Sequence, residues 1–199
     1  MASHLENLLR MAETKRLIRA RDLDEPGIPR HYLSLACARG LLERLDRGLY
    51  SLPGAEQTEH RNLAEVCKLV PHGMICLLSA LQFHGMTTQS PFEVWLAIGE
   101  SKQIPRIGLV KLRIARFSAD SLKAGVEIHN ANGPALRVFS AAKTVADCFK
   151  YRNKIGVDVA TEALRDYLRR RKGPIDDLTT YARVCRVERV MAPYLEALL

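Results

Sequence analysis

Four side chains capable of catalytic chemistry lie within eight residues of one another: Ser140, Lys143, Thr144 and Asp147. A nucleophile beside a base and a carboxylate is a combination that some enzymes use for covalent catalysis. A structural interpretation explains the same residues more simply. Ser140 suits a helix N-cap, and Lys143 and Asp147 fall four residues apart, where they can pair on one helix face. We therefore expect this segment to be structural and the protein not to be an enzyme.

The histidines and cysteines do not have the spacing of metal ligands. The six histidines show neither the His-x-x-x-His nor the His-Glu-x-x-His pattern. The five cysteines are odd in number, widely spaced and set among apolar neighbours, so we expect reduced core residues rather than disulfides or zinc ligands. A glycine-rich phosphate-binding loop is also missing from the sequence, and we expect neither a metal ion nor a cofactor.

A second group of side chains suits recognition of nucleic acid. Arg30, His31 and Ser34 fall on the polar side of a predicted helix, residues 29–39, near its N-terminus. The first turns of a helix in the major groove lie nearest to the base edges. Arginine can pair there with guanine through two hydrogen bonds, while serine and histidine reach phosphates or bases. The alternative is that these residues are merely solvated on a surface helix.

A basic ribbon follows this helix and favours the nucleic-acid interpretation. Residues 41–53 alternate apolar and polar side chains around an Asp-Arg-Gly turn, which is typical of a two-stranded β-ribbon. Arg44 and Arg47 then become candidates for phosphate or minor-groove contacts. Lys15 and Arg16 are further candidates for contact with the DNA backbone, although basic residues also suit the end of a helix.

The elements that would position these residues form a winged helix-turn-helix. A short helix over residues 19–23 ends at the segment 24–27, because Pro26 and Gly27 stop a helix. The predicted reading helix then begins at Pro29 and ends at Gly40, which suits a left-handed C-terminal cap. A preceding helix, ending near residue 16, supports the pair from behind, and the ribbon forms the wing.

Charge and composition are consistent with an anionic partner. The 199-residue chain has a net charge of +8, and clustered Lys and Arg gain free energy by releasing counterions from nucleic acid. Residues 1–54 hold a net charge of only +2, so a reading domain there must rely on a few placed residues. No apolar run approaches the ~20 residues of a membrane span, and the first residues lack the pattern of a signal peptide. We therefore expect a cytoplasmic protein.

The remainder of the chain predicts a larger second domain. Residues 53–58 predict a linker, since Pro and Gly end the ribbon there, between a winged helix-turn-helix domain at 1–52 and a domain at 59–199. Helices, strands and helices follow in that order, which indicates an α+β class with a small, mainly antiparallel sheet. The expected helices span residues 59–69, 75–83, 141–151, 157–171 and 175–199, the last broken near Arg186, and the expected strands span 92–98, 110–116, 126–129 and 136–138.

Several basic residues of the second domain could form a positive surface that binds nucleic acid or an acidic partner. Basic side chains at a helix end also complement the helix dipole and are commonly just solvated, so both interpretations stay open. The residues concerned are Lys111, Arg113, Arg116, Arg169, Arg170, Arg171 and Lys172.

Three segments, in order, resemble the AbiEi family of antitoxins. The stretch 36–50, with its Arg-Gly-Leu-Leu-Glu-Arg-Leu-Asp-Arg-Gly-Leu-Tyr core, is similar to the wing entry of that family. Residues 72–86 resemble the helix that follows the linker in the family, and residues 139–147 resemble its Ser-x-x-x-Thr-x-Ala-Asp segment. The resemblance covers nearly the whole chain.

The resemblance implies a DNA-binding transcriptional regulator. Its winged helix would bind inverted repeats in the double-stranded promoter DNA of its own operon. The C-terminal domain would counteract a nucleotidyltransferase-like toxin, without a stable complex between the two proteins, as in systems called type IV. The resemblance leaves a monomer or a weak dimer open, and a solitary regulator without a toxin would look much the same.

Two rival hypotheses come from other classes of protein. A nucleic-acid-processing enzyme could use Glu93, Glu127 or Asp147 of the second domain as metal-binding carboxylates, although single acids on strands are weak evidence. Alternatively, the winged helix could bind a protein instead of DNA. Incubation with Mg²⁺ and nucleic acid would identify the enzyme, and a lack of promoter binding would favour the protein-binding module.

Overall fold

The computed structural model describes residues 3–54, 61–89, 91–105, 107–108, 110–129 and 135–199. The chain divides into two compact units, which we describe separately. The N-terminal unit comprises residues 1–71 with the segments 105–111 and 129–136, and the C-terminal unit comprises 72–104, 112–128 and 137–199. The first unit thus extends to Pro71, beyond the predicted linker at 53–58, of which residues 55–58 lie outside the described residues.

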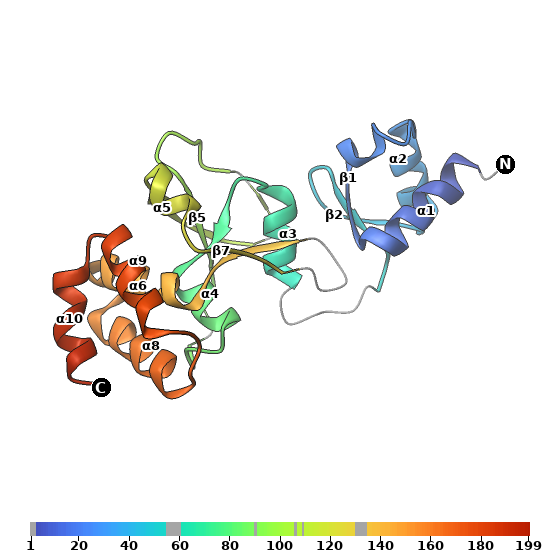
Figure 1. Ribbon diagram of the computed structural model, residues 1–199. Coiled ribbons are helices and arrows are strands. Elements are labelled where there is room, and N and C mark those ends of the chain that lie inside the picture. Colours follow the sequence, from blue (N-terminus) through green and yellow to red (C-terminus); the bar gives the residue numbers. More distant parts are fainter. Residues whose placement is uncertain (1–2, 55–60, 90, 106, 109, 130–134) are drawn as a thin grey trace. The chain divides into compact units, whose positions relative to one another are not determined.

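The N-terminal unit has the fold of a winged helix-turn-helix (Figure 1). Helix α1 (His4–Lys15) begins at a capping box in which Ser3 and Glu6 bond to each other's backbone N–H groups. The 3₁₀-helix η1 (Ala20–Leu23) and helix α2 (His31–Ala38) follow, in place of the two α-helices predicted at 19–23 and 29–39. Gly40 has a φ of 68° and accommodates the left-handed end of α2, as predicted.

Apolar side chains from all of these elements share one small core. Leu8 and Ala12 of α1 meet Leu33 and Ala36 of α2 in this cluster, and all four are buried. The turn between η1 and α2 contributes buried Ile28. Helix α2 is therefore held from behind, while the opposite side of its N-terminal half stays exposed.

The wing is a three-stranded sheet rather than a two-stranded ribbon. Strands β2 (Glu43–Asp46) and β3 (Leu49–Ser51) form the predicted antiparallel hairpin, with Gly48 at a φ of 75° in its turn. Strand β1 (Leu17–Arg19) pairs antiparallel with the other edge of β3. We predicted no strand before the turn, because three residues carry little local signal and β1 gains its hydrogen bonds from a strand that lies far along the chain.

Helix α3 (Arg61–Leu69) completes the N-terminal unit through polar contacts. The Arg19 guanidinium of β1 donates to the carbonyls of Lys68 (2.9 Å) and Leu69 (3.3 Å), which have no partner within the helix because they lie at its end. The Lys68 ammonium lies 2.6 Å from the carboxylate of Asp22, whose side chain is only 16% exposed. These contacts attach α3 to β1 and η1.

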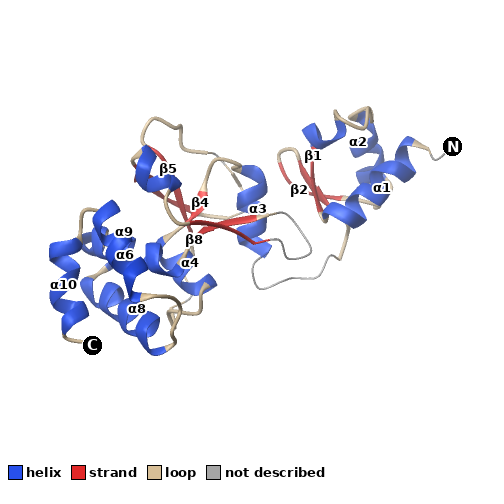
Figure 2. Cartoon of the chain, in the orientation of Figure 1, coloured by secondary structure: helices blue, strands red, loops and turns tan. Residues whose placement is uncertain are grey.

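The C-terminal unit contains a five-stranded sheet in the order β6-β5-β4-β8-β7 (Figure 2). Its strands are β4 (Met74–Ile75), β5 (Val94–Gly99), β6 (Leu112–Phe117), β7 (Val126–His129) and β8 (Leu136–Phe139). The α+β class is confirmed, and the sheet is mixed: β4–β5 is antiparallel, whereas β4–β8 and β5–β6 are parallel. The segment 100–111 permits the parallel β5–β6 pair, because it is long enough to return the chain to the start of the next strand. The sequence Asn-Gly-Pro at residues 132–134 predicts a turn between the last two strands, and these residues lie outside the described ones.

Helices pack against one another around α6 (Ala141–Lys150), which is the central helix of this unit (Figure 1). Nine of its ten residues are buried, as expected of a helix enclosed on all sides. The helices in contact with it are α4 (Leu77–Phe83), α7 (Arg152–Ile155), α8 (Val157–Arg169), α9 (Ile175–Val184) and α10 (Glu188–Glu196). The predicted break near Arg186 is confirmed: α9 and α10 are separate helices, and Arg186 between them has a φ of 59°. A short helix, α5 (Ala119–Lys123), follows β6.

One apolar run proved to be two elements. Residues 75–83, predicted as a single buried helix, contain the end of β4 and then α4, whose first residue, Leu77, has a φ of 47°. A fully buried strand and a buried helix look alike in sequence, because both are continuously apolar. Within the described residues, no helix combines the length and the apolar character that crossing a membrane requires.

Candidate nucleic-acid interface and a buried polar network

Arg30 lies at the N-cap of α2 and is joined to Asp24, in the turn that follows η1. Its Nε donates to Oδ1 of Asp24 (3.3 Å), and its Nη2 lies 2.9 Å from both carboxylate oxygens. The two side chains are 63% and 58% exposed, so the pair sits in water at the N-terminal end of the helix. Of the residues predicted to read bases, Arg30 is therefore already engaged by a carboxylate.

His31 and Ser34 also lie on the exposed side of α2. The His31 ring packs against Tyr32 with 4.4 Å between ring centroids, and His4 of α1 contacts the same tyrosine ring at 5.4 Å. This contact restricts the direction of His31. Arg30, His31 and Ser34 thus share one exposed region at the start of the helix, as their spacing predicted.

The hairpin of the wing exposes Arg44 and Arg47 on either side of Asp46. Asp46 shapes the turn, because its Oδ1 accepts the N–H of Arg47 at 2.6 Å and its backbone carbonyl accepts Nε of Arg44 at 3.3 Å. The Oδ2 atom accepts the N–H of Gly108 at 2.8 Å, which attaches Gly108 to the wing. The wing therefore presents two arginines on a turn that is held by one carboxylate.

Two further groups of basic residues flank these elements. Lys15 and Arg16 are exposed at the end of α1, where Arg16 has a φ of 56° and its N–H caps the helix by donating to the carbonyl of Ala12. Arg39, at the exposed C-cap of α2, was not among the predicted contacts. Its position between the reading helix and the wing could have been noticed in the sequence.

The structure gives internal partners to two residues of the predicted C-terminal basic surface. Arg116 donates from Nη1 to the carbonyls of Gly99, Glu100 and Lys102, at 3.2, 2.6 and 2.6 Å. This binds the loop after β5 to strand β6, a role that the sequence did not suggest.

Arg113 is the second of these residues. Its guanidinium lies over the ring of Trp95, 5.3 Å from the ring centroid, and 3.5 Å from the carboxylate of Glu93. Lys111 is exposed but belongs to the segment that groups with the N-terminal unit. All three basic residues at 111–116 are exposed, and their part in a basic surface with residues 169–172 stays a prediction.

The basic group at the end of α8 is exposed over residues 169–172. Arg170 pairs with Asp166 one turn earlier at 3.1 Å. The turn that follows is fixed by Tyr167, whose hydroxyl donates to the carbonyl of Pro174 at 2.9 Å, and burial raises the pKa of this tyrosine to about 12. Residues 169–172 form one compact basic turn, which we call the α8 basic turn.

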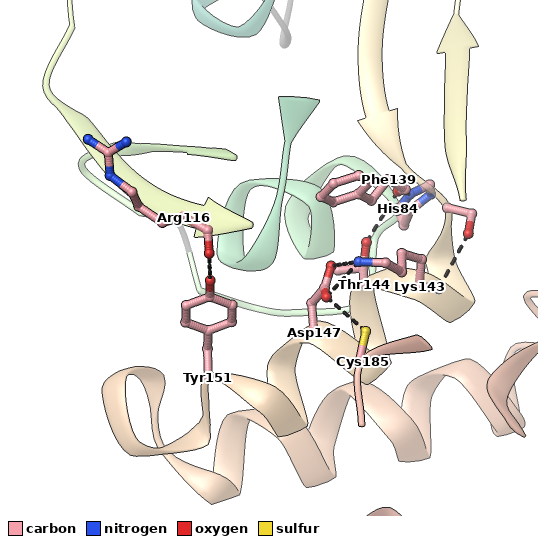
Figure 3. A network of polar contacts seen from close by, with 9 residues as sticks. His84, Arg116, Phe139, Lys143, Thr144, Asp147, Tyr151 and Cys185 are labelled. Atoms are coloured by element: carbon pink, nitrogen blue, oxygen red, sulfur yellow. Dashed lines mark hydrogen bonds and ion pairs between the residues drawn. The ribbon is translucent and has the colours of Figure 1, made fainter. Parts of the chain in front are cut away.

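The predicted pairing of Lys143 and Asp147 is confirmed, and the pair lies in the core (Figure 3). The Lys143 ammonium is 2.6 Å from both oxygens of Asp147, and neither side chain has any exposed surface. Cys185, at the end of α9, donates its S–H to Oδ1 of Asp147 at 3.2 Å. The ammonium also lies over the rings of Phe117 and Phe139, 4.9 and 4.3 Å from their centroids.

Neighbouring hydrogen bonds complete the network in Figure 3. Ser140 accepts the N–H of Lys143 and caps α6, as predicted. The carbonyl of Phe139 accepts Nε2 of His84 at 2.7 Å and the hydroxyl of Thr144 at 3.2 Å. Tyr151 donates to the carbonyl of Arg116 at 2.5 Å. The network thus joins α6 to the sheet and to α4.

Electrostatics favour a structural role for this network. Burial raises the pKa of Asp147, and the Lys143 ammonium opposes that rise. Burial, with a contribution from Asp147, holds the pKa of the Cys76 and Cys148 thiols well above the ordinary value and raises that of Cys185 to about 12. These thiols stay protonated and weakly nucleophilic. Lys143 and Asp147 have no exposed side-chain surface, as expected of groups that hold the core together.

The acids named for the rival enzyme are not gathered into one site. Glu93 pairs with Arg113 at the surface, and Asp147 is enclosed in the core. Glu127 lies on β7. In the sheet, two strands separate β7 from β5, the strand that begins directly after Glu93. In the part of the chain that the structure describes, no three His, Cys, Asp or Glu side chains are placed to hold a metal ion. All five cysteines are free thiols.

The helix, turn, helix and winged sheet of the N-terminal unit define the class of winged helix-turn-helix proteins. Residues 7–53, which include helix α2 and the wing, match a family model described as transcriptional regulator, AbiEi antitoxin. This match confirms the resemblance to the AbiEi family over that part of the chain.

Comparison with solved structures extends the fold likeness to most of the chain. The crystal structure of the RV2827C protein from Mycobacterium tuberculosis is similar with a TM-score of 0.52 and 14% sequence identity. The similarity covers 89% of this chain and 78% of that one, and at this identity it concerns the fold alone. No curated protein sequence matches the chain.

Proposed function

We propose that this protein is a DNA-binding repressor of its own operon and the antitoxin of a type IV toxin–antitoxin system. The observation that carries the proposal is the family match over residues 7–53, because the same residues form the reading helix and the wing. A role on promoter DNA implies that the protein works in the cytoplasm.

The proposed mechanism of repression is occupancy of the promoter. Helix α2 enters the major groove with Arg30, His31 and Ser34 facing the bases, and Arg44 and Arg47 contact the adjacent backbone. Lys15 and Arg16 are secondary backbone contacts. Two copies on the paired half-sites of an inverted repeat raise the affinity, either as neighbouring monomers or as a weak dimer.

Arginine variants of the wing test this mechanism. Arg47→Ala in the full chain should weaken binding to the DNA upstream of its gene. It should also lower the slope of log Kd against log salt by about one, because one phosphate is no longer neutralised. Arg44→Ala should act similarly, because both side chains are exposed on the same hairpin. Fluorescence anisotropy at several salt concentrations measures both quantities.

A matched control distinguishes the loss of a phosphate contact from the loss of one positive charge elsewhere on the protein. Arg186→Ala removes an equal charge from an exposed residue of the C-terminal unit and should leave the slope unchanged. Equal slopes for the wild type and both wing variants would refute the proposed phosphate contacts. Absence of binding by the wild type would favour a winged helix that binds protein.

The C-terminal unit is the proposed antitoxin half. Its exposed α8 basic turn is a candidate surface for contact with nucleic acid or with an acidic partner. Co-expression with a neighbouring nucleotidyltransferase-like toxin should restore growth. Reversing the charges of Arg169–Lys172 should abolish this rescue if the turn is the contact, while Arg47→Ala should retain it. A chain whose gene has no such neighbour would be a solitary regulator.

A further inference from the structure

We propose that Asp24 is a positioning residue that holds Arg30 in the orientation required to read a guanine in the major groove. The inference rests on the proposed function, in which α2 enters that groove. To that function it adds Asp24 as a positioning residue and guanine as the base that Arg30 reads. Asp24 lies outside α2, in the turn between η1 and the helix.

The geometry of the pair leaves the Nη1 group of the guanidinium free. A guanidinium carries five N–H donors in one plane. The Asp24 carboxylate occupies the edge formed by Nε and Nη2, at 2.9 to 3.3 Å. Among the described residues, no acceptor takes the Nη1 N–H groups of Arg30. Nη1 therefore keeps both of its N–H donors for guanine, whose O6 and N7 accept hydrogen bonds from arginine in the major groove.

The carboxylate is itself fixed by the turn. The backbone N–H of Asp24 donates to the carbonyl of Arg21 at 3.2 Å, and the carbonyl of Asp24 accepts the N–H of Gly27 at 3.3 Å. Gly27 has a φ of 65°, a conformation that other residues adopt only with strain. The N–H of Ile28 then donates to the carbonyl of Leu23 at 3.0 Å. Arg30 is thus oriented by a carboxylate on a well-bonded turn.

Pre-orientation explains why an exposed pair occurs at this position. A pair so open to water adds little to the stability of the fold. A free arginine, however, loses the freedom of its long side chain when it binds a base, and a partner that already restricts the side chain removes part of this loss. The same carboxylate repels phosphate groups, so it weakens binding to DNA that offers no guanine at the right place.

The experiment measures base preference in the full chain. Each G·C pair of the protected half-site is replaced in turn by A·T, and Kd is measured for the wild type and for Asp24→Asn. The wild type should show one G·C position whose replacement weakens binding on the order of 10-fold. In Asp24→Asn this penalty should fall severalfold, while affinity for poly(dA-dT), which offers no guanine, rises.

Three further variants define the controls. Glu25→Gln makes the same charge change on the next residue of the turn and should keep the full guanine penalty. Arg30→Ala and Arg30→Lys should both lose the penalty, because a lysine cannot form the bidentate pair. An unchanged melting temperature of Asp24→Asn shows that its effect does not come from loss of folding.

Each remaining outcome overturns the inference. A full guanine penalty in Asp24→Asn would show that Asp24 does not orient Arg30. Tighter promoter binding by Asp24→Asn with the same penalty would show that Asp24 competes with DNA for the arginine. A wild type without any guanine position that depends on Arg30 refutes the inference alone, whereas a wild type that does not bind the upstream DNA refutes the proposed function as well.

Discussion

Two carboxylates of this protein form ion pairs of opposite character. Asp24 pairs with Arg30 in water, where such a pair contributes about 0–1 kcal/mol. Asp147 pairs with Lys143 in the core, where desolvation is costly unless the remaining hydrogen-bonding groups are satisfied. Both Asp147 oxygens accept from the ammonium, and one also accepts from Cys185. The exposed pair is therefore available for function, and the buried pair is part of the fold.

Removal of one partner of the buried pair should be far more damaging than removal of both. Lys143→Met should lower the free energy of unfolding by about 3–5 kcal/mol at about pH 7, because it leaves a buried carboxylate without its cation. The double variant with Asp147→Leu should be destabilised much less, since no charge remains in the core. Urea denaturation of the full chain measures the three proteins. Similar destabilisation of the single and double variants would contradict this account.

Mild acid should partly restore Lys143→Met. Burial raises the pKa of Asp147, and removal of the ammonium raises it further, so the folded state binds a proton more readily than the unfolded chain does. A group with a raised pKa contributes stability that is complete below its unfolded pKa and is lost as pH rises through its folded pKa. The deficit of the variant relative to the wild type should therefore shrink from about pH 7 to about pH 5. A constant deficit would be evidence against burial of the carboxylate.

At the scale of elements, the N-terminal unit depends on polar contacts between segments that are distant in sequence. Asp22 joins η1 to α3 through Lys68, and it also accepts the backbone N–H of Arg19 at 3.0 Å. Because η1 leads directly into the turn before α2, these contacts support the element that would enter the groove. Helix α3 thus stabilises β1 and η1 of the N-terminal unit.

Asp22→Asn should weaken the contact between η1 and α3. Burial alone would raise the pKa of Asp22, but hydrogen bonds from Lys68 and from the Arg19 N–H bring it below the ordinary value. A lowered pKa gives stability that is present above the unfolded pKa and is lost as pH falls through the folded pKa. The variant should therefore be about 1 kcal/mol less stable at neutral pH and lack this part of the acid sensitivity below about pH 4.

Hydrogen exchange measured by mass spectrometry tests this expectation. Residues 61–69 should exchange faster in Asp22→Asn than in the wild type at neutral pH. Glu13→Gln, which changes an exposed acid of α1, serves as the control and should not alter the exchange. Equal protection of α3 in all three proteins would show that the contact with Asp22 does not hold the helix.

At the scale of the whole molecule, local signals in the sequence are sufficient to predict the boundaries of elements that begin or end at strong caps or turns. Gly40 marks the end of α2, Ser140 marks the start of α6, and the break near Arg186 separates α9 from α10. The pairing of Lys143 and Asp147 also followed from their spacing along a helix.

Features that depend on distant partners could not be predicted in the same way. Strands β1 and β4 are three and two residues long and exist because neighbouring strands bond to them. The parallel strand pairs depend on how the chain returns to the sheet. The contacts of Arg30 and Arg116 cross a turn or a loop, so their residue types alone gave no indication that these arginines had internal partners.

Above all, the N-terminal unit is proposed to read DNA in the promoter of its own operon. Hydroxyl-radical footprinting of the full chain on the DNA upstream of its gene tests this claim most directly. We expect two protected half-sites, about 10 base pairs or a multiple of that apart from centre to centre, and disappearance of both in Arg44→Ala Arg47→Ala. Uniform or absent protection, at concentrations where the folded protein is monodisperse, would contradict the claim.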